Sequence, residues 1–269
     1  MTRVAIIGDV GGHHAQLVDC LARLGVTATT WPAGLEVIQV GDLFGGVDDV
    51  DVARLVEPHL YAGRWRQLIG NWELEAVGGP EVTDTKGRGA DRTALEYFAR
   101  WRAAGLVTYA TTVTSRKGAT AIVTHAGVTS NYWRTNLSRH VDAVDVTDAI
   151  NNSVSPTSLW RGGRMFAGHH RMLSPSPVWA STEELWRSWS VDQPSPWPQV
   201  HGHTHSYNWA RHDWREWVPR ELTRDAHPDH RRRHVRYQPA GSQPIIGIDC
   251  ALAGATSGSL HALELDSVQ

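Results

Sequence analysis

The chain has little cysteine and almost no lysine. Its 269 residues include two cysteines, Cys20 and Cys250, and two lysines, Lys86 and Lys117. Two cysteines without a metal-binding spacing argue against a disulfide framework and a cysteine-based zinc site, and they favour a reduced compartment such as the cytoplasm. Arginine supplies the other basic side chains, which we attribute to the base composition of the source genome.

Long apolar runs and a large net charge are also absent. No apolar stretch approaches the length of a membrane span, and a strand-like run begins directly after Met1-Thr2-Arg3, so we expect neither a membrane span nor a signal peptide. The formal net charge of -2 gives no general attraction to nucleic acid or membranes, which makes a nuclease the weakest enzymatic interpretation. We expect one cytoplasmic domain spanning residues 1–269.

Histidine is concentrated late in the chain. The segment His201-Gly202-His203-Thr204-His205 places three imidazoles at alternate positions. On an extended backbone they share one face, so a cation could collect two of them. Short histidine-rich tracts also occur as solvated loops, and the rest of the chain has to decide between these alternatives.

Four apolar runs end at a side chain that can bind a metal. They lead into Gly8-Asp9, Gly41-Asp42, Gly70-Asn71 and His125-Ala126-Gly127. Short apolar runs separated by helical patterns are typical of buried strands, whose carboxyl ends carry the sites of α/β folds. Any one of these polar residues could be a turn former. Four of them together with the histidine tract predict a metal site.

The pattern predicts an α/β fold with two mixed β-sheets packed as a sandwich flanked by helices. The expected strands are Val4–Gly8, Glu36–Gly41, Arg66–Gly70, Thr108–Thr114, Ala119–Thr124, Gln199–Gly202, Ile245–Asp249 and Leu260–Leu265. The expected helices are Ala15–Leu24, Val50–Tyr61, Asp91–Ala104, Thr182–Ser190 and a segment within His140–Ile150.

These motifs, in this order, resemble the calcineurin-like metallophosphoesterases. The closing segments Ile245–Ala251 and Gly258–Leu265 are similar to the branch that includes protein serine/threonine phosphatases and diadenosine tetraphosphatases. The resemblance spans nearly the whole chain. It implies a metallophosphoesterase-like fold and hydrolysis of phosphate esters or phosphoanhydrides at a dinuclear metal centre.

The resemblance also implies a ligand set. Asp42 would bridge two divalent cations (Mn, Fe or Zn), and Asp42, Asn71 and His125 would be the catalytic residues. The implied ligands of one cation are Asp42, Asn71, His125 and His203, and those of the other are Asp9, Asp42 and His205. Because the second set is smaller, we expect the first site to fill first.

Three departures from the family pattern concern the chemistry. Gly11 stands where a metal-ligating His is expected, and Gly45 and Gly46 stand where a further Asp and a phosphate-binding Arg usually follow. Trp72 replaces the His that normally assists the leaving group, and an indole cannot take over that proton transfer. We therefore expect a preference for good leaving groups, such as aryl esters or phosphoanhydrides.

Several residues keep two interpretations. His13 or His14 could replace the missing imidazole, or could be ordinary polar residues of a first helical turn. His201 is expected to support the ligands or to be solvated. Arg161 and Arg164 are candidate phosphate-binding residues because guanidinium matches phosphate geometry, although either could lie in solvent.

Two late segments are unusual. Many of the 13 tryptophans lie between positions 160 and 217; they could stack on nucleobases, but packing of long loops is the interpretation that we favour. A charged insertion at about 208–240, with its most charged part at Arg211–His234, is typical of a solvated loop, and the alternative is a lid that recruits anionic substrate.

The predicted function is a metal-dependent phosphoesterase acting on a phosphorylated small molecule, nucleotide or phosphoprotein. The alternative is a degenerate relative that keeps the fold and serves as a metal- or ligand-binding module.

Overall fold

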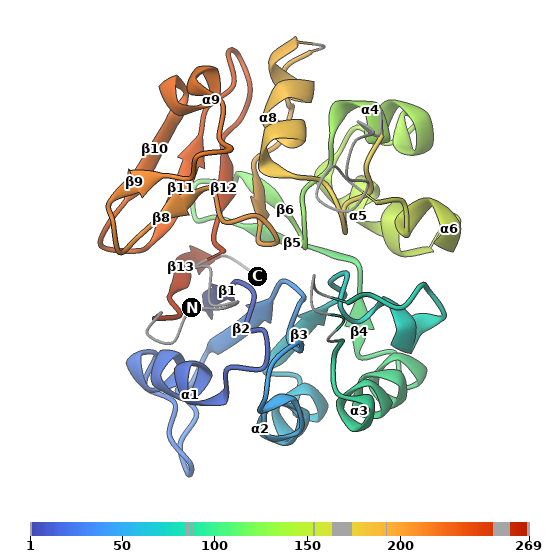
Figure 1. The fold of residues 1–269 in the computed structure, drawn as a ribbon, viewed down its shortest axis with the longest axis vertical. Helices are drawn as coiled ribbons and strands as arrows, with labels where there is room; N and C mark the ends of the chain where they lie inside the picture. The colour runs from blue at the N-terminus through green and yellow to red at the C-terminus, as the bar shows by residue number, and fades with distance from the viewer. Residues whose placement is uncertain are drawn as a thin grey trace.

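Two β-sheets pack face to face, with helices on the outer face of each (Figure 1). The computed structural model describes residues 2–83, 87, 89–152, 154–162, 174–191, 193–249 and 259–267. Cys250 and Arg164 lie outside the described residues. The predicted sandwich of two mixed sheets is confirmed.

The first sheet has the strand order β13-β1-β2-β3-β4. Its strands are β1 (Thr2–Ile7), β2 (Leu35–Gln39), β3 (Trp65–Leu68), β4 (Val107–Thr108) and β13 (Ala262–Ser267). The first four are parallel, and β13 pairs antiparallel with β1. Parallel strands need crossovers on a face of the sheet, which the helices between them provide.

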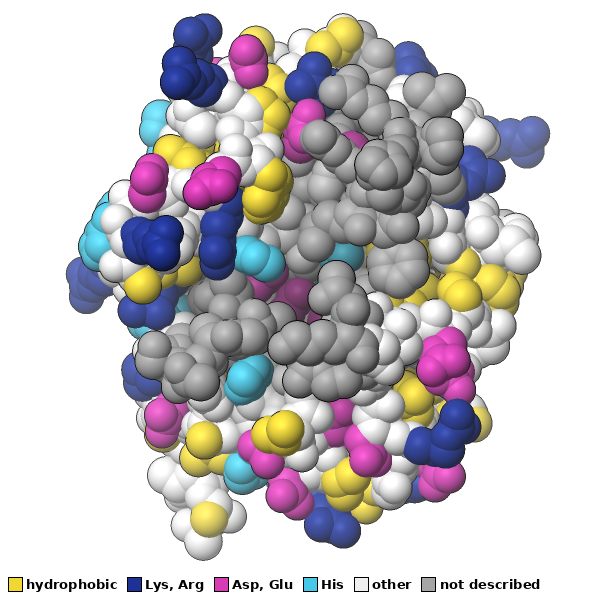
Figure 2. Space-filling view, in the orientation of Figure 1, with side chains coloured by type: hydrophobic (Ala, Val, Ile, Leu, Met, Phe, Trp, Pro, Cys, Tyr) yellow, Lys and Arg dark blue, Asp and Glu magenta, His cyan; other side chains and the backbone are white. Residues whose placement is uncertain are grey.

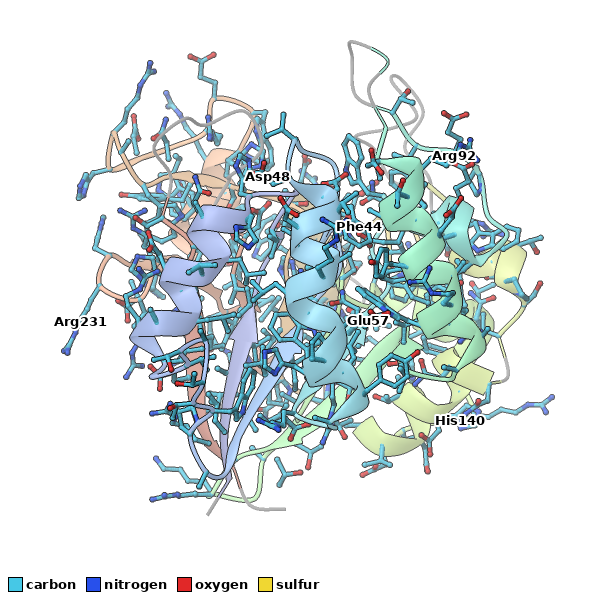
Figure 3. The ribbon with its side chains drawn as sticks, turned by 90° about the horizontal axis from the view of Figure 1, so that it is seen from below. Phe44, Asp48, Glu57, Arg92, His140 and Arg231 are labelled. Carbon is cyan, nitrogen blue, oxygen red and sulfur yellow. The ribbon has the colours of Figure 1, made fainter. Side chains whose placement is uncertain are left out.

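The crossover helices are α1 (His14–Arg23), α2 (Asp49–Tyr61) and α3 (Arg92–Ala103), with a short 3₁₀ segment η1 (Leu74–Val77) before α3. They lie side by side across the outer face of this sheet (Figure 3). Asp91 begins α3 by accepting hydrogen bonds from the backbone N–H groups of Thr93 and Ala94. Between α2 and α3, Glu57 accepts a hydrogen bond from the Trp101 indole at 3.1 Å.

The second sheet has the order β10-β11-β12-β7-β6-β5. Its strands are β5 (Ala110–Thr114), β6 (Thr120–Thr124), β7 (Gln199–His201), β10 (Ala226–Asp229), β11 (His234–Tyr237) and β12 (Ile245–Gly247). The helical segments above it are α4 (Ser130–Tyr132), the π-helical η2 (Trp133–Leu137), α5 (Ala143–Asn152), α6 (Pro156–Leu159) and α8 (Thr182–Val191).

The interior of the sandwich is a small β-branched cluster. Its side chains come from both sheets and include Val4, Ile6, Ile38, Val123 and Val200. A larger apolar cluster joins the sheets to their helices. Most residues of the strands that precede the predicted ligands are buried, as the sequence suggested, although β3 and β7 also contain polar side chains.

Most tryptophan side chains pack in or against the hydrophobic core. Trp179, Trp186, Trp189 and Trp197 are at most 8% exposed, which confirms the packing interpretation for them, whereas Trp217 is 44% exposed. Among the described residues, no helix is both long enough and apolar enough to cross a bilayer.

The charged insertion is more ordered than the sequence indicated. It forms β8 (Tyr207–Asn208), β9 (Asp213–Trp214) and α9 (Arg220–Arg224), and it then contributes β10 and β11 to the second sheet. The loop interpretation is therefore wrong for the residues of these strands and of α9, although side chains such as those of Asp213 and Arg220 are exposed to solvent. Val235 and Tyr237 are buried and alternate with an exposed Arg236, so the strand signal was present but was hidden by the charges.

Candidate metal centre

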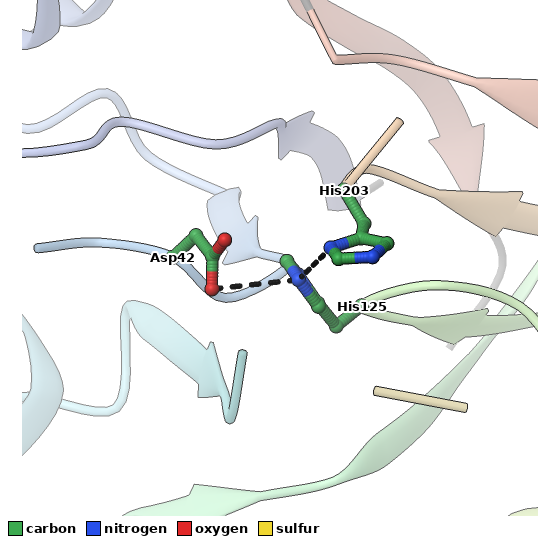
Figure 4. A group of neighbouring side chains, drawn as sticks. All are labelled: Asp42, His125 and His203. Carbon is green, nitrogen blue, oxygen red and sulfur yellow. Dashed lines mark hydrogen bonds and ion pairs between the residues drawn. The ribbon is translucent and has the colours of Figure 1, made fainter. Parts of the chain in front are cut away.

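Three predicted ligands converge where strands of both sheets end. Asp42 follows β2, His125 follows β6 and His203 follows β7. One ligand atom from each lies within 4.8 Å of the others, and all three side chains are buried (Figure 4). Asn71, which follows β3, joins them through its Oδ1 atom, 3.0 Å from His125 Nε2.

The His125 ring shows that this group fits a cation. Its Nδ1 lies 3.1 Å from the Val40 carbonyl, which can only accept, so Nδ1 carries the proton. Burial lowers the pKa of His125 well below its ordinary value, which keeps the ring neutral. Nε2 then turns its lone pair toward His203 Nδ1 at 3.1 Å and Asp42 Oδ1 at 3.4 Å. A cation at this point could be bound by Nε2 and by the surrounding His203, Asp42 and Asn71 atoms.

Glycines that precede ligands allow the loops to approach so closely. A Cβ on Gly70 would lie 2.2 Å from both the backbone N and the Oδ1 of Asp42, and a Cβ on Gly202 would lie 2.2 Å from Asp9 Oδ1. Asp42 and His203 themselves have φ of 54° and 63°. Such left-handed backbone is uncommon for residues other than glycine and gathers at functional sites.

Glu73 ties two of these loops together, a role that the sequence did not reveal. It is fully buried, and its Oε1 accepts from the backbone N–H groups of Leu43 and Phe44 at 2.8 and 3.2 Å. Its Oε2 accepts from those of Asp42 and Gly70 at 3.0 and 2.9 Å. The carboxylate thereby holds the backbone on either side of Asp42 and Asn71.

The electrostatics of the centre favour uncharged side chains. Burial, reinforced by neighbouring carboxylates, raises the pKa values of Asp9 and Asp42 well above their ordinary range. Burial lowers the pKa of His203 to about 4. Carboxylates that resist ionisation and imidazoles that stay neutral form a donor set that a divalent cation would stabilise in its ligating state.

The other two predicted ligands, Asp9 and His205, lie beside this group and outside its compact core. Both oxygens of Asp9 accept from the His203 backbone N–H, at 2.9 and 3.1 Å, and His205 Nδ1 lies 3.6 Å from Asp249 Oδ2. Asp249 is 8% exposed and also raises the pKa of Asp9. Our sequence interpretation gave Asp249 no role, although it closely follows the apolar strand β12, which is parallel to β7.

Two close contacts join the residues that the sequence singled out as departures: Gly46 lies against Gly11, and Gly45 lies against Trp72. A Cβ on Gly46 would lie 2.3 Å from the Gly11 carbonyl, and a Cβ on Gly45 would lie 3.0 Å from the Trp72 ring. The loops after β1, β2 and β3 thus pack directly on one another. A side chain at Gly46 would not fit this packing without a shift of the backbone, and one at Gly45 would press on the Trp72 ring.

The remaining sequence candidates lie outside the ligand cluster. The His13 ring is 3.8 Å from the position of a Cβ on Gly11, and His13 is not part of the compact group. His201 is fully buried and stacks on Tyr237 with 6.4 Å between ring centroids, so a solvated position is wrong. Arg161 is exposed.

The two ends of the insertion line different cavities, and only the β8–β9 end adjoins a predicted metal ligand. His205 and the β8–β9 segment line a cavity of about 290 Å³. Arg231 and Arg232 instead line a cavity of about 460 Å³ with Arg3 and Arg23, beside α1, where Figure 3 labels Arg231. None of the predicted metal ligands lines that second cavity, so the arginine cluster does not lie over the centre.

No family model and no curated protein matches this sequence. Two solved structures are similar in outline. A candidate diadenosine tetraphosphatase is 17% identical with a TM-score of 0.44, over 98% of this chain and 94% of that chain. A protein serine/threonine phosphatase from Saccharomyces cerevisiae is 12% identical with a TM-score of 0.42, over 100% of this chain and 81% of that chain. The case for a function therefore depends on the site itself.

Proposed function

We propose that the protein is a metal-dependent phosphoesterase that hydrolyses phosphate esters or phosphoanhydrides. The observation that carries this proposal is the His125 Nε2 atom, which faces Asn71 Oδ1, His203 Nδ1 and Asp42 Oδ1 within 3.4 Å. A neutral imidazole, an amide oxygen and a carboxylate are ligands for Mn²⁺, Fe²⁺ or Zn²⁺.

In this proposal the ligands have distinct roles. Asp42, Asn71, His125 and His203 would hold the first cation. Asp9, Asp42 and His205 would hold a second one more weakly, because His205 is 30% exposed and its set is smaller. When bound, two such cations would supply an acidified water and charge neutralisation for an in-line displacement at phosphorus. The protein's own contribution is orientation: the Val40 carbonyl fixes the His125 ring, and Glu73 fixes the loops of Asp42 and Asn71.

Trp72 shapes the expected substrate preference. Its backbone N–H donates to Asp42 Oδ1 at 3.1 Å, so position 72 adjoins the proposed cation, but an indole cannot protonate a departing alkoxide. General acid assistance is worth roughly 10² to 10⁴ in rate. We expect aryl phosphates and phosphoanhydrides to be hydrolysed much faster than alkyl phosphates such as phosphoserine.

The test combines metal analysis with a substrate panel. The protein is loaded with Mn²⁺, its metal content is measured by elemental analysis, and turnover of phenyl phosphate, a dinucleoside polyphosphate and phosphoserine is compared. Bound metal with turnover of the first two supports the proposal. Two bound metals without turnover of any substrate would contradict the phosphoesterase proposal. Equal rates for aryl and alkyl esters would contradict the predicted preference for good leaving groups.

The second candidate function is a binding module with little catalysis. It is favoured by the packing of Gly11, Gly46 and Trp72, which occupies positions where the family pattern has functional side chains. One cation or none per chain, together with no turnover, would support the module. The predicted cytoplasmic location stays a prediction; fractionation of cells that express the tagged chain would test it.

A further inference from the structure

We propose that Arg215, from the charged insertion, binds a phosphate oxygen of the substrate beside the metal centre. This inference rests on the proposed phosphoesterase function and identifies a part of its substrate site. Neither the family pattern nor our sequence interpretation gave Arg215 a role. Arg215 lines a cavity, carries a buried donor without a partner among the described residues, and directly follows β9.

The cavity lies against a proposed metal ligand. It has a volume of about 290 Å³, and His205 forms one wall. The other walls come from the insertion, including Asn208, Arg211, Arg215 and Trp217. Figure 2 shows basic and acidic side chains together over β8 and β9, beside a hollow in which further acidic side chains are visible. A cavity that begins at a ligand is where the organic part or a second phosphoryl group of a substrate would lie.

Arg215 presents a donor without an acceptor. Its Nε atom is buried and has no hydrogen-bond partner among the described residues. A buried, unpaired donor on a charged group is costly, and such groups are usually paired in folded proteins. Because Arg215 also lines the cavity, a rotation of its side chain would bring guanidinium donors to a phosphate oxygen there, which they match in geometry and charge.

The backbone fixes Arg215 next to the centre. Its N–H donates to the Ser206 carbonyl at 3.0 Å, so the residue after His205 is bonded to Arg215. The Ser206 hydroxyl is hydrogen-bonded to the Tyr237 hydroxyl in the buried interior, which anchors this contact to the second sheet. The backbone of Arg215 is therefore held by the same segment that contains His205.

Hydrogen bonds from side chains of the cavity lining, and not the net charge of the lining, would select the ligand. Asp213 and Glu216 also line the cavity and offset the charges of Arg211 and Arg215. A balanced lining gives little general attraction to anions, so affinity depends on donors that point at the ligand. Trp217, 44% exposed in the same lining, offers an apolar face to the organic part of the substrate. The ligand class is an organic phosphate with a planar or apolar group.

The insertion thereby compensates for one departure of the chain. Gly45 and Gly46 pack against Trp72 and Gly11, and neither can supply the guanidinium that the family pattern places after Asp42. Arg215 directly follows β9 of the two-stranded β8–β9 sheet and lines the same cavity as His205, so it could supply a guanidinium on the His205 side of the centre.

The experiment compares Arg215→Ala and Arg215→Lys with a control, Arg220→Ala, which changes an exposed arginine of the same insertion. All are loaded with Mn²⁺, and metal content, phenyl phosphate kinetics and the affinity for inorganic phosphate are measured. For Arg215→Ala we expect unchanged metal content, a KM raised roughly 10- to 100-fold with kcat unchanged, and weaker phosphate binding. Arg215→Lys should recover part of this loss, and Arg220→Ala should behave as wild type.

The outcomes separate this inference from the proposed function. Wild-type kinetics and phosphate affinity in Arg215→Ala would overturn the inference and leave the proposed function intact. If the wild-type protein binds metal without turnover, the proposed function fails, and phosphate titration then decides: weaker binding by Arg215→Ala supports the inference, whereas equal or no binding by both proteins overturns it. Lower metal content in Arg215→Ala than in the control would also overturn it.

Discussion

The substitution Glu73→Gln tests how the loops of the centre are held. Glu73 is fully buried and accepts four backbone N–H bonds, two on each oxygen. The bonds favour its ionised form, and burial opposes it. Burial is the larger effect and raises the pKa of Glu73 from 4.5 to about 7. In the protein without metal, the glutamic acid should therefore carry its proton up to near neutral pH.

The magnitude follows from this shift. A group whose pKa is higher in the folded state stabilises the protein below its unfolded pKa, and this contribution is lost as the pH rises through the folded pKa. A shift from 4.5 to about 7 corresponds to roughly 3 kcal/mol. Glutamine cannot ionise, so the variant should not lose this stability as the pH rises. It also places an NH₂ donor opposite two backbone N–H groups, which costs about 1–3 kcal/mol at any pH.

The assay is urea unfolding of both proteins with a chelator at pH 5 and pH 8. At pH 5 the variant should be less stable than wild type by about 1–3 kcal/mol. At pH 8 that deficit should shrink or reverse, with a total change of roughly 3 kcal/mol. A stability difference that stays constant across this range would contradict the prediction, because it would mean that the four N–H donors keep Glu73 ionised despite its burial.

Three further changes have defined outcomes. His125→Ala removes a proposed ligand and should weaken Mn²⁺ binding by more than the roughly 10- to 100-fold typical of a lost supporting residue; calorimetric titration with unchanged affinity would exclude His125 as a ligand. Trp72→His should raise the hydrolysis of alkyl phosphates more than that of aryl phosphates, and a change that is equal for both would show that position 72 does not face the leaving group. Burial lowers the pKa of His201 to about 4, so the wild type should lose stability as the pH falls below 6.5, and His201→Phe should lack that loss. Between pH 7 and pH 5 the variant should gain about 2 kcal/mol relative to wild type in urea unfolding, and parallel pH profiles would contradict this.

The strands that carry ligands were predictable because their pattern is strong and local. Each predicted ligand follows an apolar run, and the carboxyl ends of such runs meet at one edge. Asp42, His125 and His203 accordingly come together, with Asn71 bonded to His125.

Contacts between distant loops could not be predicted from the sequence. Nothing near Glu73 in the sequence shows that it accepts from Leu43 and Phe44, about thirty positions earlier. The packing of Gly46 on Gly11 is likewise a property of two loops and of neither alone. In the insertion, charge at alternate positions concealed the buried Val235 and Tyr237 of an ordinary edge hairpin.

The pairing of β1 with β13 has a consequence for folding. β1 begins at Thr2 and β13 ends at Ser267, and all six β1 residues are matched in register with β13. Contacts this far apart in the chain form slowly, because a large loop must close first. During synthesis, the strand that leads to Asp9 has to wait until β13 has emerged before this edge is covered. Assembly of the edge that carries the proposed metal ligands is therefore expected to be late in folding.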